Sequence, residues 1–277
     1  MLTRPKGRRA PAVLLHALLL GLATSAPAHA LDALLPPSGN FDLTHWKLTL
    51  PSGSEVQPWV LSNGWTQSNV FYTSPQSGGM VFRCPNLAGT TANSNYSRTE
   101  LREMLDPTSS AHDDSNNWTT AVGGRMKARL KVDRVSTTGE SGKVGRVIIG
   151  QIHGESTEPA RLYFHKKPGE AKGRIYLATE TTGGSNSYST DIVKNTNGDG
   201  IALGELFTYV ITLKDTRLQV DILRKQGALV NTYIRSIDSG YRGENLYFKA
   251  GVYNQNNTGT SSDYVQATFY SLTHTHP

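Results

Sequence analysis

The chain has 277 residues, with 28 lysines and arginines against 22 aspartates and glutamates, a formal net charge of +6 and one cysteine. A single cysteine excludes an intramolecular disulfide, so the hydrophobic core must stabilise the fold. Residues 1–30 hold four of the cations and none of the acids, which leaves 24 cations, 22 acids and a net charge of +2 for residues 31–277. With so small an excess, we expect neither nucleic acid nor a membrane as a partner.

Residues 1–30 show the three parts of a secretory signal peptide in order. Four cations precede the apolar run AVLLHALLLGLA, and the small residues of APAHA follow it. The apolar run is too short to span a bilayer comfortably. We expect cleavage near Ala30 and export to the periplasm or the medium. No Pro- or Ser-rich linker divides residues 31–277, which predicts a single domain.

Short runs of alternating apolar and polar residues dominate residues 31–277, and clusters of Gly, Asn, Ser and Asp separate them. Examples in chain order are FDLTHWKLTLP (41–51), GGMVFRCP (78–85), GRMKARLKVDRV (124–135), FTYVITLKD (207–215) and VQATFYSLT (265–273). Stretches with helical periodicity are scarce. This pattern predicts an all-β fold built as an antiparallel sandwich or barrel.

The segment SRTELRE at 97–103 is the first predicted strand with an unusual polar face. Alternation places Arg98, Glu100 and Arg102 on one side, with roughly 7 Å between successive members. Two guanidinium groups at that spacing can each bind a carboxylate in a bidentate manner, and Glu100 between them can hold both in position. Ion pairs on a solvated sheet face would give the same pattern.

The segment VIIGQIHG at 147–154 begins as a buried strand and then becomes polar on one face. Alternation puts Ile148 and Ile152 on one side and groups Val147, Ile149, Gln151 and His153 on the other. An amide and an imidazole that emerge from an apolar run suit the floor of a site, because buried neighbours fix their rotamers. A histidine satisfied within the core is the alternative.

The segment NTNGDG at 195–200 has side chains with oxygen atoms at alternate positions, as calcium-binding loops do. Leu206, however, stands where the bidentate glutamate of such a loop would be. A tight turn explains the same residues, so we expect no metal.

The segment YFKAGVYNQ at 247–255 is the third predicted strand with a polar face. Alternation separates an apolar face from a second face that consists of Tyr247, Lys249, Gly251, Tyr253 and Gln255. Gly251 is expected to leave room there for a sugar ring.

The three polar faces together offer cations, amides and phenols but a single carboxylate. Glycoside hydrolysis usually needs two carboxyl groups, and serine hydrolases need a G-x-S-x-G elbow that the chain lacks. The set instead suits β-elimination from a uronic acid: cations and an amide neutralise the carboxylate, a histidine or tyrosine removes the adjacent proton, and a tyrosine protonates the leaving oxygen. This chemistry requires no metal or organic cofactor. A non-catalytic module that binds an acidic polysaccharide is the alternative.

With RTELR at 98–102, QIH at 151–153 and YFKAGVYNQ at 247–255, the sequence resembles the alginate lyases of polysaccharide lyase family 7. The segment at 41–51 is similar to the family's N-terminal strand, so the resemblance covers almost all of residues 31–277. It implies an antiparallel β-sandwich of jelly-roll type with a concave substrate groove, an alginate partner and cleavage by β-elimination.

The resemblance also implies roles for individual residues by matching position. Arg98 and Gln151 would neutralise the C5 carboxylate, His153 would assist or act as the base, and Tyr253 would be the acid or acid/base. The expected substrate-binding residues are Glu100, Arg102, Tyr247, Lys249 and Gln255. In this family an isoleucine between Gln and His tends to accompany cleavage at guluronate-containing bonds, and Ile152 occupies that position. We expect endolytic action by a monomer.

Overall fold

The computed structural model describes residues 1, 30–111, 114–184, 187–196, 198–224 and 227–277, and the fold below is that of Leu31–Pro277. The predicted signal peptide therefore lies almost entirely outside the described residues. One position of the segment NTNGDG, residue 197, lies outside them as well.

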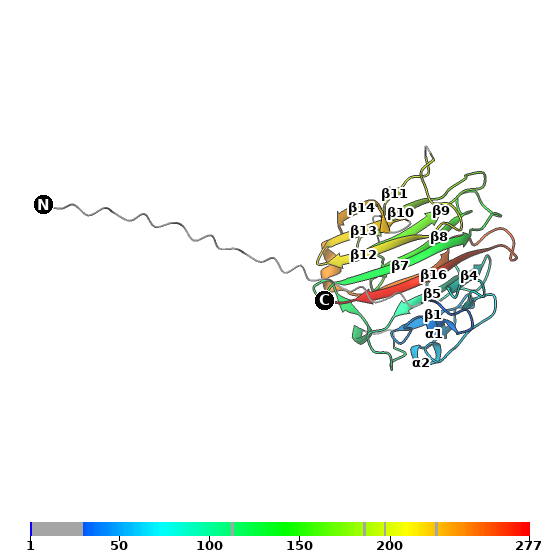
Figure 1. The fold of residues 1–277 in the computed structure, drawn as a ribbon, viewed down its shortest axis with the longest axis horizontal. Helices are drawn as coiled ribbons and strands as arrows, with labels where there is room; N and C mark the ends of the chain where they lie inside the picture. Colours follow the sequence, from blue (N-terminus) through cyan, green and yellow to red (C-terminus); the bar gives the residue numbers. More distant parts are fainter. Residues whose placement is uncertain (2–29, 112–113, 185–186, 197, 225–226) are drawn as a thin grey trace. The chain divides into compact units, whose positions relative to one another are not determined.

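The alternating runs form the strands of two antiparallel sheets, as predicted (Figure 1). Within the described residues, the larger sheet has nine strands, in the spatial order β11 (Ser187–Val193), β10 (Arg174–Glu180), β9 (Ala160–His165), β8 (Arg146–His153), β15 (Asn245–Asn254), β5 (Arg98–Glu103), β1 (Trp46–Thr49) and β2 (Glu55–Val56), with β6 (Trp118–Thr119) paired to β15. The smaller sheet has the order β14 (Leu229–Ser236), β13 (Arg217–Leu223), β12 (Phe207–Lys214), β7 (Gly124–Arg134), β16 (Tyr264–Thr275), β4 (Met80–Pro85) and β3 (Phe71–Thr73).

Helical structure is limited to short turns in the described part of the chain. These are α1 (Pro37–Asn40), α2 (Pro58–Leu61) and the 3₁₀ turns η1 (Asp114–Asn116) and η3 (Ser239–Gly243). Among the described residues, no helix is long and apolar enough to cross a bilayer.

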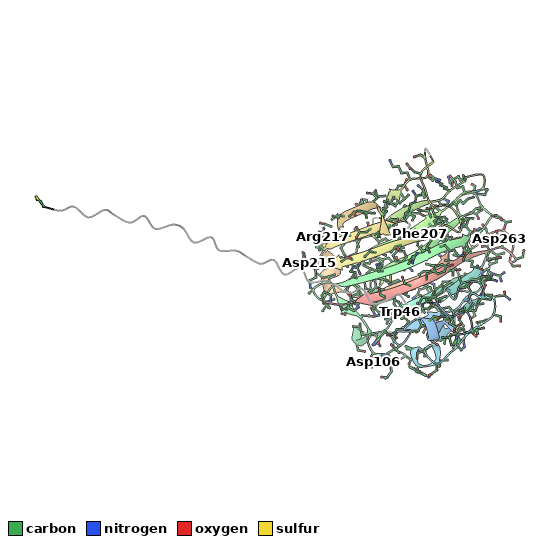
Figure 2. All side chains as sticks on the ribbon, in the orientation of Figure 1. Trp46, Asp106, Phe207, Asp215, Arg217 and Asp263 are labelled. Atoms are coloured by element: carbon green, nitrogen blue, oxygen red, sulfur yellow. The ribbon has the colours of Figure 1, made fainter. Side chains whose placement is uncertain are left out.

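The hydrophobic core lies between the two sheets and draws on both of them. On β7, Met126 and Ala128 are buried while Arg125 and Lys127 are exposed, which is the period of two expected for a strand with one solvated face. Trp46 on β1 and Phe207 on β12 are among the largest fully buried side chains (Figure 2). The tight turn between β12 and β13 is made at Asp215, whose φ is 52°. The fold is thus the predicted antiparallel β-sandwich.

Simple alternation fails in β8, and this corrects the predicted face of its first half. Val147 and Ile149 lie in the core together with Ile152, whereas Ile148 lies on the opposite face of the sheet. The pairing of β8 with β9 shifts register between Ile148 and Gly150, which marks a β-bulge that exchanges the two faces. Because the bulge precedes Gln151, that residue and His153 still share a face.

Packing from the other sheet explains why glycine occupies the bulge. A Cβ atom on Gly150 would lie 2.7 Å from the hydroxyl oxygen of Tyr209, which projects from β12. That hydroxyl donates to the carbonyl of Ile149 at 2.9 Å. Ile149 is paired with no residue of β9 or of β15 in the described strand registers. Tyr209 therefore provides a hydrogen bond where the strand pairing is interrupted.

Gly251 on β15 is required by the backbone conformation and by the close approach of β5. It does not provide space for a sugar, contrary to the prediction. Its φ is 142°, a conformation that residues with side chains rarely adopt. A Cβ there would lie 2.6 Å from the carbonyl oxygen of Thr99 and 2.9 Å from the Cα of Glu100. The register of β15 against β8 shifts between Ala250 and Tyr253, so Gly251 lies within a second irregularity of the sheet.

Candidate active site

A groove of about 880 Å³ opens on the face of the larger sheet that points away from the core. Strands β5, β8 and β15 contribute the predicted site residues that line it, which are Arg98, Arg102, His153, Tyr247, Lys249 and Tyr253. The segments between β4 and β5 and between β8 and β9 provide its walls. Segments far apart in the sequence, including Thr49, Gly53 and Glu55 of the β1–β2 region, thus form one cavity.

Strand pairing brings these residues together, because β15 lies between β5 and β8. Tyr253 pairs with Arg98 on β5. Lys249 pairs with Arg102 on one side and with Gln151 on the other, so a cation, a second cation and an amide form a row across the strands. Tyr247 pairs with His153.

Glu100 lies beneath the groove and connects three of the predicted residues. It is fully buried, and its carboxylate accepts from Arg98 at 3.2 Å, from Lys249 at 2.8 Å and from the amide nitrogen of Gln151 at 2.5 Å. Burial by itself raises the pKa of Glu100, but Lys249 and Arg98 outweigh burial and lower the pKa below its usual value. Glu100 is therefore ionised and positions its partners; it is not placed to contact substrate as the sequence suggested.

Arg102 does not share Glu100 with Arg98, which corrects the predicted arrangement. Its guanidinium group donates instead to the side chain of Asn117 at 2.6 Å and to the carbonyl of Glu103 at 2.7 Å. It also lies 4.1 Å from the ring centre of Tyr247. The Tyr247 ring stacks in turn on His153, with 5.0 Å between ring centres.

Tyr253 lies in the groove against Arg98. The guanidinium carbon of Arg98 is 3.7 Å from the centre of the tyrosine ring. The tyrosine hydroxyl shares a hydrogen bond of 2.7 Å with the hydroxyl of Ser94, which also accepts from Arg98 at 3.1 Å. Burial raises the pKa of Tyr253, so the phenol keeps its proton at neutral pH and can donate it.

His153 is held in the opposite protonation state to the tyrosine. Its Nδ1 donates to the carbonyl of Gly154 at 2.5 Å, so the lone pair of the neutral ring is on Nε2. Burial, with the nearby charge of Lys249, lowers the pKa of His153 to about 4. The imidazole is therefore neutral at pH 7 and can accept a proton.

Glu158 is a groove residue that sequence reasoning missed. It lines the cavity from the segment between β8 and β9, and one of its oxygens is 3.3 Å from Nε2 of His153. Burial raises the pKa of Glu158 to about 7, although Arg161, at 3.7 Å, acts in the other direction. Strand alternation does not reveal Glu158, because the residue follows the end of β8. Its only sequence signal is an acid five residues after His153.

Two predicted residues are present but covered. Gln151 is fully buried on the groove face, and its amide oxygen has no hydrogen-bond partner among the described residues. Gln255 is 6% exposed, follows the end of β15 and does not line the groove; its backbone N–H donates to the carbonyl of Arg146 at 3.1 Å. The structure therefore gives no support for direct contact between Gln255 and substrate in this groove.

No group of three or more His, Cys, Asp or Glu side chains that could hold a metal ion occurs among the described residues. The charged side chains that line the groove are the cations Arg98, Arg102 and Lys249 and the acids Glu55, Glu155 and Glu158.

A β-sandwich groove that combines a neutral histidine, a protonated tyrosine and several cations defines a class of protein, the polysaccharide lyases that act on acidic polymers. Comparison with known proteins identifies the family. A family model described as alginate lyase matches residues 41–276. An alginate lyase of Klebsiella pneumoniae is 39% identical over 292 residues, covering 91% of this chain and 94% of that protein.

Solved structures agree with this assignment. The crystal structure of the alginate lyase from Klebsiella pneumoniae has a TM-score of 0.80 at 37% identity, and the match covers 87% of this chain and 99% of that one. A variant of the family 7 alginate lyase A1-II' in complex with product GGG has a TM-score of 0.72 at 31% identity, covering 88% of this chain and 100% of that one. Another A1-II' variant, in complex with substrate GGMG, has a TM-score of 0.71 at 31% identity, with coverage of 88% and 97%.

The chain belongs to the alginate lyases of polysaccharide lyase family 7. The resemblance predicted from its three motifs is thereby confirmed, together with the jelly-roll fold and lyase activity. Membership of this enzyme family also removes the ground for the alternative of a binding module.

Proposed function

We propose that this lyase cleaves alginate within the chain at guluronate-containing bonds, with Arg98, Gln151, His153 and Tyr253 at the reacting centre. The C5 proton of the uronate passes to Nε2 of His153, and its electron pair forms the C4–C5 double bond. The bond from C4 to the glycosidic oxygen breaks, and the Tyr253 hydroxyl protonates the departing oxygen. Each proton and electron pair is thus accounted for, and one product begins with an unsaturated uronate.

The single observation that carries this proposal is that a neutral His153 and a protonated Tyr253 line the same groove. These protonation states support His153 as the base and Tyr253 as the acid at neutral pH. The cation Arg98 lies against the tyrosine ring, where it can pair with the carboxylate of the sugar being cleaved. That pairing lowers the cost of the negative charge that develops when the C5 proton leaves.

Gln151 supports the same charge through its amide. The amide nitrogen has two N–H groups, and Glu100 accepts one of them at 2.5 Å. In this proposal the second N–H donates to the substrate carboxylate once the bound sugar has displaced the side chains that bury Gln151. Since Glu100 also holds Arg98, one buried acid positions both groups that neutralise the substrate.

The position of the site within the sheet supports endolytic action. Strand β15 is an interior strand, with β8 to β11 on one side and β5, β1 and β2 on the other. A polymer lying across this face can extend past the scissile bond in both directions. The oligosaccharide complexes of the A1-II' variants support an alginate chain as the occupant of the groove.

The guluronate preference rests on the isoleucine between Gln151 and His153. Ile152 is fully buried in the core and faces away from the groove. Ile152 cannot contact a sugar directly, so its influence on bond preference would act through the positions of Gln151 and His153.

The experiment that tests the proposal is digestion of polyguluronate, polymannuronate and mixed alginate, each followed by ultraviolet absorbance and by sizing of the products over time. Unsaturated products of intermediate length, formed fastest from polyguluronate, are the expected result. Release of only the shortest products from the start would overturn the endolytic mode, and faster cleavage of polymannuronate would overturn the preference. We further propose that residues 1–30 direct export, which N-terminal sequencing of the secreted protein tests.

A further inference from the structure

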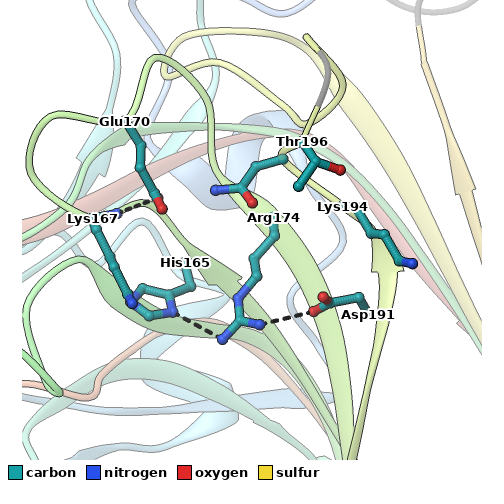
Figure 3. A pocket seen from close by; sticks show the side chains of 8 residues that line it. His165, Lys167, Glu170, Arg174, Asp191, Lys194 and Thr196 are labelled. Carbon is teal, nitrogen blue, oxygen red and sulfur yellow. Dashed lines mark hydrogen bonds and ion pairs between the residues drawn. The ribbon is translucent and has the colours of Figure 1, made fainter.

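A second cavity, of about 220 Å³, lies on the larger sheet beyond the active-site groove (Figure 3). It forms where β9 ends, β10 begins and β11 ends. Its lining contains the charged side chains of Lys167, Glu170, Arg174, Asp191 and Lys194, together with His165, whose pKa is lowered to about 4 by burial and by Arg174 and which is therefore neutral at pH 7. No residue of this cavity belongs to the three motifs that define the active site.

The floor of the larger sheet connects this second cavity to Tyr253. Tyr253 packs against a cluster on the groove face that contains Ile148, Tyr163 and Tyr176. His165 lies two residues from Tyr163 on β9, and Arg174 lies two residues from Tyr176 on β10, so both share that face. With strands roughly 4.8 Å apart, β9 and β15 are only two strand spacings apart, so one extended ligand can cover both sites.

The cations in the second cavity exceed its acids. Figure 3 shows Arg174 between His165 and Asp191, and the guanidinium group is 3.1 Å from the aspartate. In the part of the chain that the structure describes, neither Lys167 nor Lys194 has a carboxylate within ion-pair distance, and both are exposed. These two ammonium groups are therefore available to an anion from solvent.

Arg146 extends this positive charge toward the active site. It stands on β8 directly opposite His165, two residues from Ile148 of the floor cluster. Among the described residues Arg146 has no carboxylate partner, and its buried Nε lacks a hydrogen-bond partner. A buried donor without a partner costs free energy, which an anionic ligand can offset.

We propose that the second cavity and Arg146 form a distal subsite, which binds the carboxylate of a uronate in the same polysaccharide chain, away from the bond that is cleaved. The inference rests on the proposed function, because the ligand is a remote part of the same substrate. Charge complementarity selects a polyuronate, since each of its sugars carries a carboxylate, whereas a neutral glycan gains no charge attraction from Lys167 or Lys194.

The test compares the wild-type enzyme with Lys194→Glu on alginate oligosaccharides of increasing length and on the polymer. Reversing one exposed charge should lower kcat/KM on the polymer by about 3- to 10-fold, mainly through KM, since exposed ionic contacts are individually weak. The two enzymes should agree on the shortest cleaved oligosaccharide and diverge above the length that reaches the second cavity. Lys167→Glu should behave in the same way.

The matched control is Lys127→Glu, an equal charge reversal at an exposed position of β7 in the other sheet. An equal loss for Lys127→Glu and Lys194→Glu, or a loss independent of substrate length, would overturn the distal subsite and leave only a general effect of net charge. If the wild-type enzyme produced no unsaturated sugar from any alginate, the proposed function itself would fail. The two failures are therefore distinguishable.

Discussion

Glu100 and Glu103 lie three residues apart on β5, and both are fully buried, yet they have different surroundings. An odd separation along a strand sends the two side chains to opposite faces. The partners of Glu100 are Arg98 and Lys249, whose side chains reach the groove, and the buried amide of Gln151.

Glu103 is surrounded by groups that connect strands of the sheet and do not line the groove. It accepts from the indole N–H of Trp118 and from the backbone N–H of Phe248, both at 2.9 Å. The rings of His276 and His274, at 2.7 Å and 3.4 Å, complete its environment. These contacts join β5 to β6, β15 and the C-terminal end of the chain.

The comparison shows that burial of a carboxylate does not by itself indicate a functional site. Both acids have pKa values below the usual range, because in each case the partners outweigh the burial that raises it. What differs is where the partners point. Two partners of Glu100 line a cavity, while the partners of Glu103 belong to strands that pack together.

The largest expected effect tests whether catalysis in the groove depends on the hydroxyl of Tyr253. Tyr253→Phe removes one hydroxyl with little change of volume, so folding should survive while kcat falls by roughly 10²-fold or more, as for loss of a general acid. Tyr247→Phe is the control on the same strand and should change mainly KM. Steady-state kinetics on alginate measures both, and the assignment fails if Tyr247→Phe is the variant that loses turnover.

The next effect tests the two acids directly. Glu100→Gln should lower kcat/KM by about 10- to 100-fold, because Arg98 and Lys249 lose the charge that positions them. Glu103→Gln should leave kcat/KM within a few-fold but lower the free energy of unfolding by about 1.5–3 kcal/mol, the scale of a lost hydrogen bond to a charged group. Kinetics well below the melting temperature, with urea unfolding of both variants, separates activity from stability. Equal activity losses in the two variants would contradict the comparison.

The pH dependence of turnover should reveal Glu158 on the groove side. Above a pH of about 7 this acid is ionised and stabilises the imidazolium that forms when Nε2 of His153 accepts a proton; below it, the neutral acid can donate to Nε2 and block it. The kcat should therefore rise through pH 7 in the wild-type enzyme, and Glu158→Gln should flatten the rise, with a loss of about 3- to 10-fold at pH 8. Glu155→Gln removes an acid from the same segment as a control. An unchanged profile in Glu158→Gln would exclude this role.

The smallest effect concerns the contact between Glu103 and His276 and the pH dependence of stability. Burial alone lowers the pKa of His276, but Glu103 outweighs burial and raises it above the ordinary value. A histidine with a raised pKa stabilises the fold fully below its unfolded pKa, near 6.5, and this stabilisation disappears as the pH rises through the folded pKa. The free energy of unfolding should thus fall between pH 6 and pH 8.5 more in the wild-type protein than in His276→Gln. Parallel curves would show that the ion pair adds nothing.

Much of the active site could be predicted from sequence because period-two alternation is local. Arg98, Glu100 and Arg102 do share a face of β5, since nothing interrupts that strand. Gln151 and His153 share a face for the same reason. The upstream half of β8 was predicted wrongly, because a bulge beside Tyr209 exchanges the faces, and the contact that favours it comes from a residue 60 positions away.

The sequence by itself thus determined the all-β class, the polar faces of three strands and the family, because alternation and short motifs depend only on residues close together in the chain. Only the folded chain decided that Glu100 lies beneath Lys249, that Arg102 pairs with Asn117, and that Glu158 faces His153. These contacts depend on strand order, register and loop paths, which join residues distant in sequence and are set by the packing of two whole sheets.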